Sequence, residues 1–133
     1  MILLDTHCLV WFDTANPSLG SSARVVIDEA RLGGAAAVSA VTFWECALLL
    51  KKGRLRLPLL VEQWHADLQA LGFVELPLDG ALAMASVALH LPLKDPADRF
   101  IVATALAFDA TLVTADQRIL DWSSGLKRHD ARL

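Results

Sequence analysis

The chain alternates short apolar runs with longer stretches in which apolar residues recur every three or four positions. The short runs predict buried strands, at 2–4, 35–39, 73–76 and 111–113. The periodic stretches predict helices, over 23–32, 41–52, 59–71, 81–89 and 96–108. Because strands and helices alternate, the pattern predicts an α/β fold in which helices cover both faces of a parallel sheet.

Ordinary turn residues separate these elements, among them Asn16-Pro17, Gly33-Gly34 and Gly72. No linker, repeat or low-complexity segment interrupts the pattern. A chain of 133 residues is long enough to bury one core, so we expect a single domain over 1–133.

The composition is more apolar than that of an average globular domain. Apolar residues make up 55% of the chain and the mean hydropathy is +0.45, so we expect a partner protein or a second copy to cover part of the surface. No apolar run reaches the roughly 20 residues of a membrane span, and no signal peptide precedes the first strand. We therefore expect a cytoplasmic protein without a membrane segment.

Four acidic residues stand beside apolar faces, where a charge is costly unless something compensates it. Asp5 and Asp116 follow predicted strands, and Glu45 and Asp98 lie on predicted helices next to apolar neighbours. The strand ends of open parallel sheets are common ligand sites. Oxygen ligands without a cysteine or histidine pattern favour Mg²⁺ or Mn²⁺, and water polarised by such an ion can attack phosphorus in line.

Each of these acids also has a purely structural interpretation. Glu45 suits a capping box with Thr42, and Asp98 suits the positive end of its helix. Asp116 suits the N-cap of a short helix, and Asp5 suits a turn at the end of its strand. Taken singly, these structural interpretations are the more common ones. The four positions together favour a shared site, because the separate explanations give no reason for acids at all of them.

Four segments that contain these acids follow one another in an order typical of one protein family. They are Leu3-Leu4-Asp5-Thr6-His7, Ser39-Ala40-Val41-Thr42-Phe43-Trp44-Glu45, Asp95-Pro96-Ala97-Asp98-Arg99-Phe100-Ile101-Val102-Ala103-Thr104-Ala105, and Leu112-Val113-Thr114-Ala115-Asp116. Together they resemble the motifs of PIN-domain ribonucleases, and within them the VapC-type toxins of type II toxin-antitoxin systems. The match spans the chain, and its most specific part runs from Asp95 to Arg99.

This resemblance implies a fold, an activity and a cofactor. The implied fold is a three-layer α/β/α sandwich with a short parallel sheet. The implied activity is that of a toxin endoribonuclease, which hydrolyses RNA phosphodiester bonds with a metal-activated water and thereby inhibits translation. The implied cofactor is Mg²⁺ or Mn²⁺ in an acidic pocket.

The resemblance also implies the residues of the site. The catalytic residues would be the four acids, Asp5, Glu45, Asp98 and Asp116, of which Asp5, Asp98 and Asp116 would hold the metal. Thr114 matches a family hydroxyl that steadies the pocket. Thr6 and Asp95 fall beside the site as supporting residues, and Asp95 is in addition expected to be a helix N-cap before Pro96.

Basic residues decide how an acidic chain could bind RNA. The net charge is −3, whereas phosphate contacts normally need lysine and arginine. The candidates for RNA binding are Lys51, Lys52, Arg54 and Arg99. A second basic cluster comprises Lys127, Arg128 and Arg132. The segment with Lys51, Lys52, Arg54 and Arg56 also suits a solvated helix end with cations near its C-terminus, so that interpretation stays open.

The expected partners besides RNA come from the resemblance and from the apolar surplus. We expect a homodimer, and a small antitoxin protein whose peptide enters a groove near Trp44 and Trp64. Core packing is otherwise the common role of the four tryptophans. The four histidines are scattered, and only His7, beside Asp5, lies near a candidate site.

Two other functions agree with part of the pattern. A catalytically weak RNA-binding or protein-binding module of the same fold would keep the surface without the chemistry. A haloacid-dehalogenase-like phosphatase also begins with a strand that ends in aspartate, but it needs a second aspartate two residues later, and position 7 is histidine.

Overall fold

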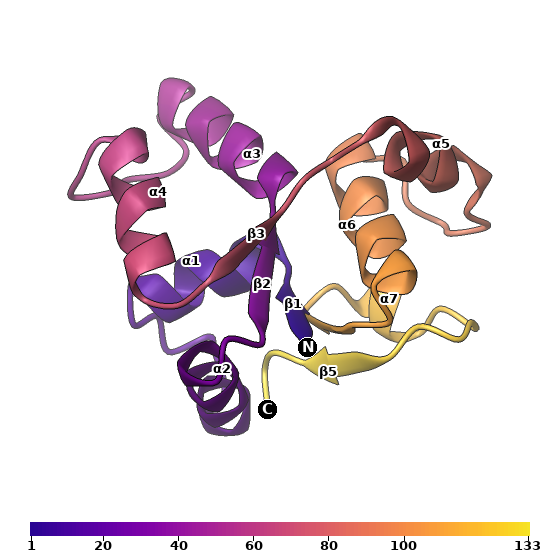
Figure 1. Ribbon diagram of the computed structural model, residues 1–133, viewed down its shortest axis with the longest axis horizontal. Coiled ribbons are helices and arrows are strands. Elements are labelled where there is room, and N and C mark those ends of the chain that lie inside the picture. Colours follow the sequence, from indigo (N-terminus) through magenta and orange to yellow (C-terminus); the bar gives the residue numbers. More distant parts are fainter.

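The computed structural model describes all 133 residues and is built around a five-stranded parallel sheet (Figure 1). The strands are β1 (Ile2–Leu4), β2 (Ala36–Ser39), β3 (Val74–Leu76), β4 (Thr111–Thr114) and β5 (Arg128–Asp130). Their order across the sheet is β3-β2-β1-β4-β5. The chain therefore extends the sheet first to one side of β1 and then to the other. The topological switch point lies where β1 meets β4.

Seven helices connect the strands. They are α1 (Thr6–Asp13), α2 (Ser21–Leu32), α3 (Ala40–Lys51), α4 (Val61–Ala70), α5 (Gly80–Ala88), α6 (Pro96–Ala107) and α7 (Gln117–Leu120). Helices α1, α2 and α4 lie on one side of the sheet, and α6 and α7 lie on the other, with α5 packed against α6 (Figure 1). None of the helices is both long and apolar enough to cross a membrane.

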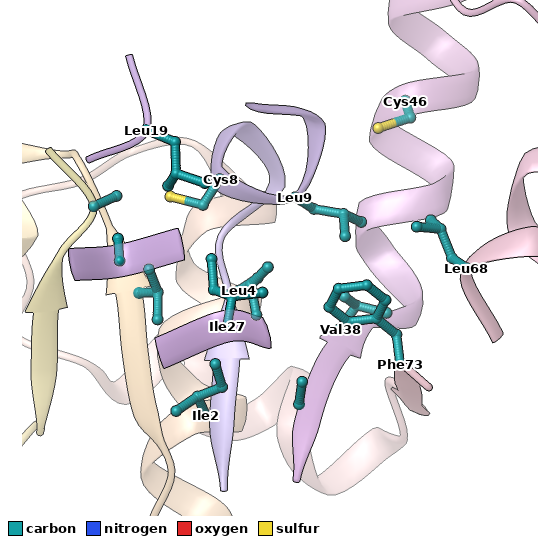
Figure 2. Packing of buried hydrophobic residues seen from close by; sticks show 14 of the residues in the cluster. Ile2, Leu4, Cys8, Leu9, Leu19, Ile27, Val38, Cys46, Leu68 and Phe73 are labelled. Carbon is teal, nitrogen blue, oxygen red and sulfur yellow. The ribbon is translucent and has the colours of Figure 1, made fainter. Parts of the chain in front are cut away.

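Strand residues point alternately into two cores, one on each face of the sheet. Ile2 and Leu4 belong to the core under α1, α2 and α4, whereas Leu3 belongs to the core under α6. Figure 2 shows the first of these cores, where Cys8 of α1 and Ile27 of α2 pack over β1. Both faces of the central strands are buried, and this explains why their sequences are continuous apolar runs. The predicted α/β/α sandwich is confirmed.

Four predicted strands and five predicted helices are present, with ends that differ by no more than two residues. Two elements were not predicted. Helix α1 follows β1 directly, and its nearly continuous apolar sequence shows no stripe of 3.6-residue period. Strand β5 falls in the segment that the sequence predicts as a basic tail, because Arg128–Asp130 is a polar edge strand without an apolar run.

Polar caps start four helices at the carboxyl end of the sheet. Asp5 caps α1 and accepts from the N–H of Thr6, and Ser39 caps α3 directly after β2. Asp116 caps α7 just after β4, and Asp95 caps α6, as its sequence before Pro96 predicts. These caps bring helix N-termini and acidic side chains to the same edge of the sheet.

Candidate active site

A cavity of about 400 Å³ opens at the carboxyl ends of β1 and β4, at the switch point of the sheet. Asp5, Asp98 and Asp116 line it, so the structure brings together three of the four acids predicted from the sequence. These carboxylates come from three separate elements, the ends of β1 and β4 and the first turn of α6. Glu45 joins the group through its contacts with α6 and α1.

Asp5 is the most buried of the acids, with a residue exposure of 6%. Its Oδ1 accepts a 2.7 Å hydrogen bond from the N–H of Thr6, and its Oδ2 accepts a 2.8 Å hydrogen bond from the hydroxyl of Thr114. Burial raises the pKa of Asp5, although the bond from Thr114 acts in the opposite direction. The two bonds fix the direction of this carboxylate.

Asp98 stands in the first turn of α6 and faces other acids. Burial, followed by the charges of Asp5, Asp95 and Glu45, raises its pKa to about 7. The carboxylate is therefore only partly ionised near neutrality unless a cation compensates it. The N-terminus of α6 favours the ionised form of Asp98, but this effect is smaller than those of burial and of the neighbouring charges.

Glu45 does not form the capping box that its spacing from Thr42 suggested. Ser39 caps α3 instead, and the hydroxyl of Thr42 lies 3.0 Å from the hydroxyl of Thr6. The Oε1 atom of Glu45 is buried and has no hydrogen-bond partner. Burial raises the pKa of Glu45, and a hydrogen bond from Thr6 partly offsets this effect. A buried carboxylate oxygen without a protein partner fits a site that takes a cation or a water molecule.

Carboxylate oxygens of Glu45, Asp95 and Asp98 lie within 4.8 Å of one another. Three hard oxygen donors at this spacing, one with an unpaired buried atom, fit a divalent cation such as Mg²⁺ or Mn²⁺. Asp95 thus combines two roles, because it caps α6 and also contributes to this group. The resemblance had suggested Asp5, Asp98 and Asp116 as metal ligands, and Asp98 is common to both sets.

Asp116 is the acid whose structural interpretation holds in full. It caps α7 by accepting from the N–H of Arg118, and both of its carboxylate oxygens accept from the guanidinium of Arg118. These bonds hold the pKa of Asp116 below its ordinary value. Arg118 is exposed and lines the cavity, so it adds a positive charge at the rim of an otherwise acidic site.

The cavity contains side chains that the sequence reasoning did not assign to it. His7 and Trp11 of α1 line it, and so do Gln117 and Arg118 of α7. The sequence spacing could have indicated the first pair, because residues four apart share a face of a helix, and Asp5 caps the helix that carries them. Trp11 had been assigned to core packing, but it is only half-buried and borders the cavity.

The RNA-binding candidates differ in their environments. Lys51, Lys52 and Arg54 are exposed at the C-terminal end of α3 and do not line the acidic cavity. Arg99 points into the protein, where its guanidinium donates to backbone carbonyls of Ser86, Leu89, Leu91 and Leu93. It holds the segment after α5 against α6, and this role replaces the predicted contact with RNA.

The C-terminal cations are also engaged within the protein. Lys127 pairs with Asp109, Arg132 pairs with Asp130, and Arg128 donates to backbone carbonyls. The predicted second basic edge is therefore not a free cationic surface.

The two tryptophans expected beside a partner groove lie in different places. Trp44 is 59% exposed and borders an apolar cavity of about 360 Å³ with Val41, Leu78 and Phe100. Trp64 is buried, and its indole N–H donates to Asp13. The expected groove therefore includes Trp44, and the prediction that it includes Trp64 is wrong.

Comparison with known proteins gives one family. Residues 2–123 match the model of the PIN domain. Ribonuclease VapC22 of Mycobacterium tuberculosis is 33% identical over 121 residues, which are 89% of this chain and 88% of that protein. VapBC2 from Rickettsia felis, bound to a DNA fragment from their promoter, has a TM-score of 0.69 at 19% identity and covers 97% of this chain and 98% of its own. A toxin-antitoxin complex from Klebsiella pneumoniae gives 0.64 at 23% identity, with 95% of each chain covered. The two structures support the fold.

Proposed function

Because this chain belongs to the PIN-domain family, we propose that it is a metal-dependent endoribonuclease and the toxin of a toxin-antitoxin pair. Its relative of 33% identity is a ribonuclease of the VapC type. The proposal assigns the activity to the cytoplasm, where hydrolysis of RNA would inhibit translation.

One observation carries the proposal, namely the oxygens of Glu45, Asp95 and Asp98 within 4.8 Å of one another. Like charges this close are unfavourable by themselves, as the raised pKa of Asp98 shows. The orphaned Oε1 of Glu45 adds a second unfavourable contribution. Both are explained if the site evolved to hold a divalent cation, with Asp5 at the adjoining wall of the cavity.

The residues of the chain have distinct roles in this proposal. Glu45, Asp95 and Asp98 would hold Mg²⁺ or Mn²⁺ together with Asp5, a metal ligand that the family resemblance implies. The ion would supply a polarised water and neutralise charge on the phosphodiester. Asp5 is oriented by Thr6 and Thr114 before any ligand arrives, so its position costs no reorganisation during the reaction.

Asp116 and Arg118 act at the rim of the cavity. Their ion pair places a guanidinium beside the acids, where it is available to a flanking phosphate of the substrate.

Thr42 fixes the hydroxyl of Thr6, which in turn contacts Glu45.

We further propose that a small antitoxin and a second copy of the chain are its protein partners. The apolar cavity beside Trp44 supports the first partner, because an exposed indole with apolar neighbours suits the apolar side chains of a peptide. The acidic cavity lined by Asp5, Asp98 and Asp116 suits an arginine or lysine of the same peptide, which would satisfy the carboxylates in place of a metal.

The test is an RNA cleavage assay with purified protein in EDTA, in Mg²⁺ and in Mn²⁺. We expect cleavage with either ion and none in EDTA, and we expect Asp98→Asn and Asp5→Asn to abolish it while they keep the fold. A protein that binds RNA but does not cut it under any of these conditions would be the catalytically weak module instead. Sequencing of RNA ends after brief expression then identifies the substrate and the cut site.

A further inference from the structure

We infer that Trp11 is a stacking platform for an unpaired RNA base beside the scissile phosphodiester. The inference rests on the proposed ribonuclease function and names a base-binding subsite of that same cavity. A base must leave its own stack to reach an aromatic side chain, so the subsite takes an unstacked base.

The position of Trp11 on α1 directs it to the cavity. His7 and Trp11 are four residues apart and both line the cavity, whereas Cys8 and Leu9 on the same helix are fully buried in the core. Asp5 caps this helix, so the carboxylate of Asp5 and the indole of Trp11 are held by the same rigid element. Trp11 lies six residues after Asp5, which is less than two turns of helix and about 9 Å along the axis.

Trp11 is in contact with both the core and the cavity. The side chain is half-buried, and it packs against the core under α1, α2 and α4. It also borders the cavity, where Ala115 is the only other apolar lining residue. Packing against the core restricts the movement of the indole, and this lowers the entropy lost when a planar ligand binds.

The indole N–H groups separate Trp11 from the tryptophans with structural roles. Trp64 donates to Asp13 and Trp122 donates to the carbonyl of His90, so both polar atoms are satisfied within the protein. Trp11 makes no such bond within the protein, and its N–H is not buried, so solvent in the cavity reaches it. The polar edge of this indole is therefore open to a ligand, whereas those of Trp64 and Trp122 are already paired.

The charges around the cavity explain why the ligand at Trp11 is a base. Phosphates of RNA are repelled by Asp5 and Asp98 except where a cation intervenes, or where Arg118 contributes its positive charge. A nucleobase is uncharged and has an aromatic face, so it can lie on Trp11 next to these acids without that penalty. Stacking tolerates every base, and Trp11 therefore contributes affinity rather than sequence choice.

The test compares two ligands of equal charge, a single-stranded hexa-adenylate and an abasic ribose-phosphate hexamer, in Ca²⁺ buffer to limit turnover. We expect Trp11→Leu to raise the Kd for hexa-adenylate by roughly 5- to 100-fold, the range expected for one lost base stack. Binding of the abasic hexamer should stay unchanged. An equal loss for both ligands would indicate a structural effect and would overturn the inference.

A second variant, Trp11→Phe, keeps the test valid if Trp11→Leu does not fold. Trp11→Phe keeps an aromatic face without the N–H, so we expect the Kd for hexa-adenylate to stay within about threefold of wild type. Hexa-adenylate should quench the tryptophan emission of the wild type, and the quench should disappear in Trp11→Phe. A quench that persists in this variant would overturn the inference.

Phe108→Leu is the matched control. Phe108 is an exposed aromatic residue, at the end of α6 opposite to Asp98, and its replacement should change neither ligand's affinity. Absence of RNA cleavage by the wild type in Mg²⁺ and Mn²⁺ would overturn the proposed function. A wild type that cleaves RNA, with unchanged hexa-adenylate binding by Trp11→Leu, would overturn the stacking inference alone.

Discussion

The hydroxyl of Thr114 donates a 2.8 Å hydrogen bond to Oδ2 of Asp5 and thereby joins two residues 109 positions apart in the chain. Both residues are buried at the carboxyl ends of neighbouring strands, β4 and β1. The same hydroxyl accepts from the N–H of Asp116, 3.1 Å away. Thr114 therefore links the orientation of one acid to the start of the helix that another acid caps.

Replacement of Thr114 by valine should weaken metal binding. Thr114→Val keeps the shape but removes the donor, so Oδ2 of Asp5 loses its partner in a buried site. We expect Mn²⁺ affinity to fall by roughly 10- to 100-fold, the usual effect of removing a partner that orients a metal site. Thr114→Ser should restore affinity to within a few fold. Isothermal titration calorimetry measures both, and equal affinities for the valine variant and the wild type would contradict the role of Thr114.

Asp98 should make the metal-free protein less stable as the pH rises. Its pKa is about 7 in the folded state, against an ordinary value of 3.8, so folding favours the protonated carboxyl. The stabilisation is fully present below about pH 4 and is lost progressively up to about pH 7. In the metal-free protein at pH 8, Asp98→Asn should therefore melt higher than wild type, by ~4 °C for about 1 kcal/mol after allowance for solvent screening.

Melting curves between pH 4 and pH 8, with EDTA and with Mn²⁺, check this expectation. The difference between Asp98→Asn and wild type should shrink as the pH falls towards 4, where the carboxyl is protonated in the folded state and partly protonated in the unfolded state. Mn²⁺ should raise the melting temperature of the wild type at pH 8 more than that of the variant. A variant that melts well below wild type at pH 8 in EDTA would show that Asp98 has a structural role.

The ends of the RNA products distinguish two kinds of ribonuclease chemistry. Attack by water should leave 5′-phosphate and 3′-hydroxyl ends, whereas attack by the neighbouring 2′-hydroxyl leaves a cyclic phosphate. We expect the first outcome with Mg²⁺ or Mn²⁺ and little turnover with Ca²⁺, whose coordination is larger and looser. Mass spectrometry of a short oligonucleotide cut by the protein identifies the ends. Cyclic phosphate ends would reject the water-based mechanism.

The antitoxin proposal predicts that inhibition depends on two contacts. The apolar contact is Trp44, so Trp44→Glu should weaken inhibition by the cognate small protein by at least tenfold. The polar contact is a cation of the antitoxin in the acidic cavity, and reversal of its charge should weaken inhibition more than loss of a contact at the rim. Phe108→Leu should be inhibited like the wild type.

Inhibition constants from the cleavage assay and sedimentation of the purified chain check both partner proposals. A protein that stays monomeric at micromolar concentration would contradict the dimer. Equal inhibition of wild type and Trp44→Glu would show that the antitoxin binds elsewhere.

Local patterns in the sequence predict most of the elements of this fold. Central strands such as Ile2–Leu4 are buried on both faces, so they must be apolar throughout, and a run of that kind is visible without any structure. The start of α6 is equally visible, because Asp95 and Pro96 satisfy the backbone of a first helical turn by themselves. The four acids, beside apolar residues and at strand ends, can also be identified from the sequence.

Only the tertiary structure decides which of these residues meet. The sequence places Glu45 and Asp98 on apolar helix faces, but the pairing of α3 with α6 brings their oxygens beside those of Asp95. Charge alone suggested that Arg99 binds RNA, whereas the fold directs it to backbone carbonyls. The period of a helix tells which face is apolar, but the neighbour of that face depends on strand order and on contacts between residues far apart in the chain. For this reason the place of Trp11 beside the acids is decided only by the pairing of β1 with β4, which forms the cavity at their carboxyl ends.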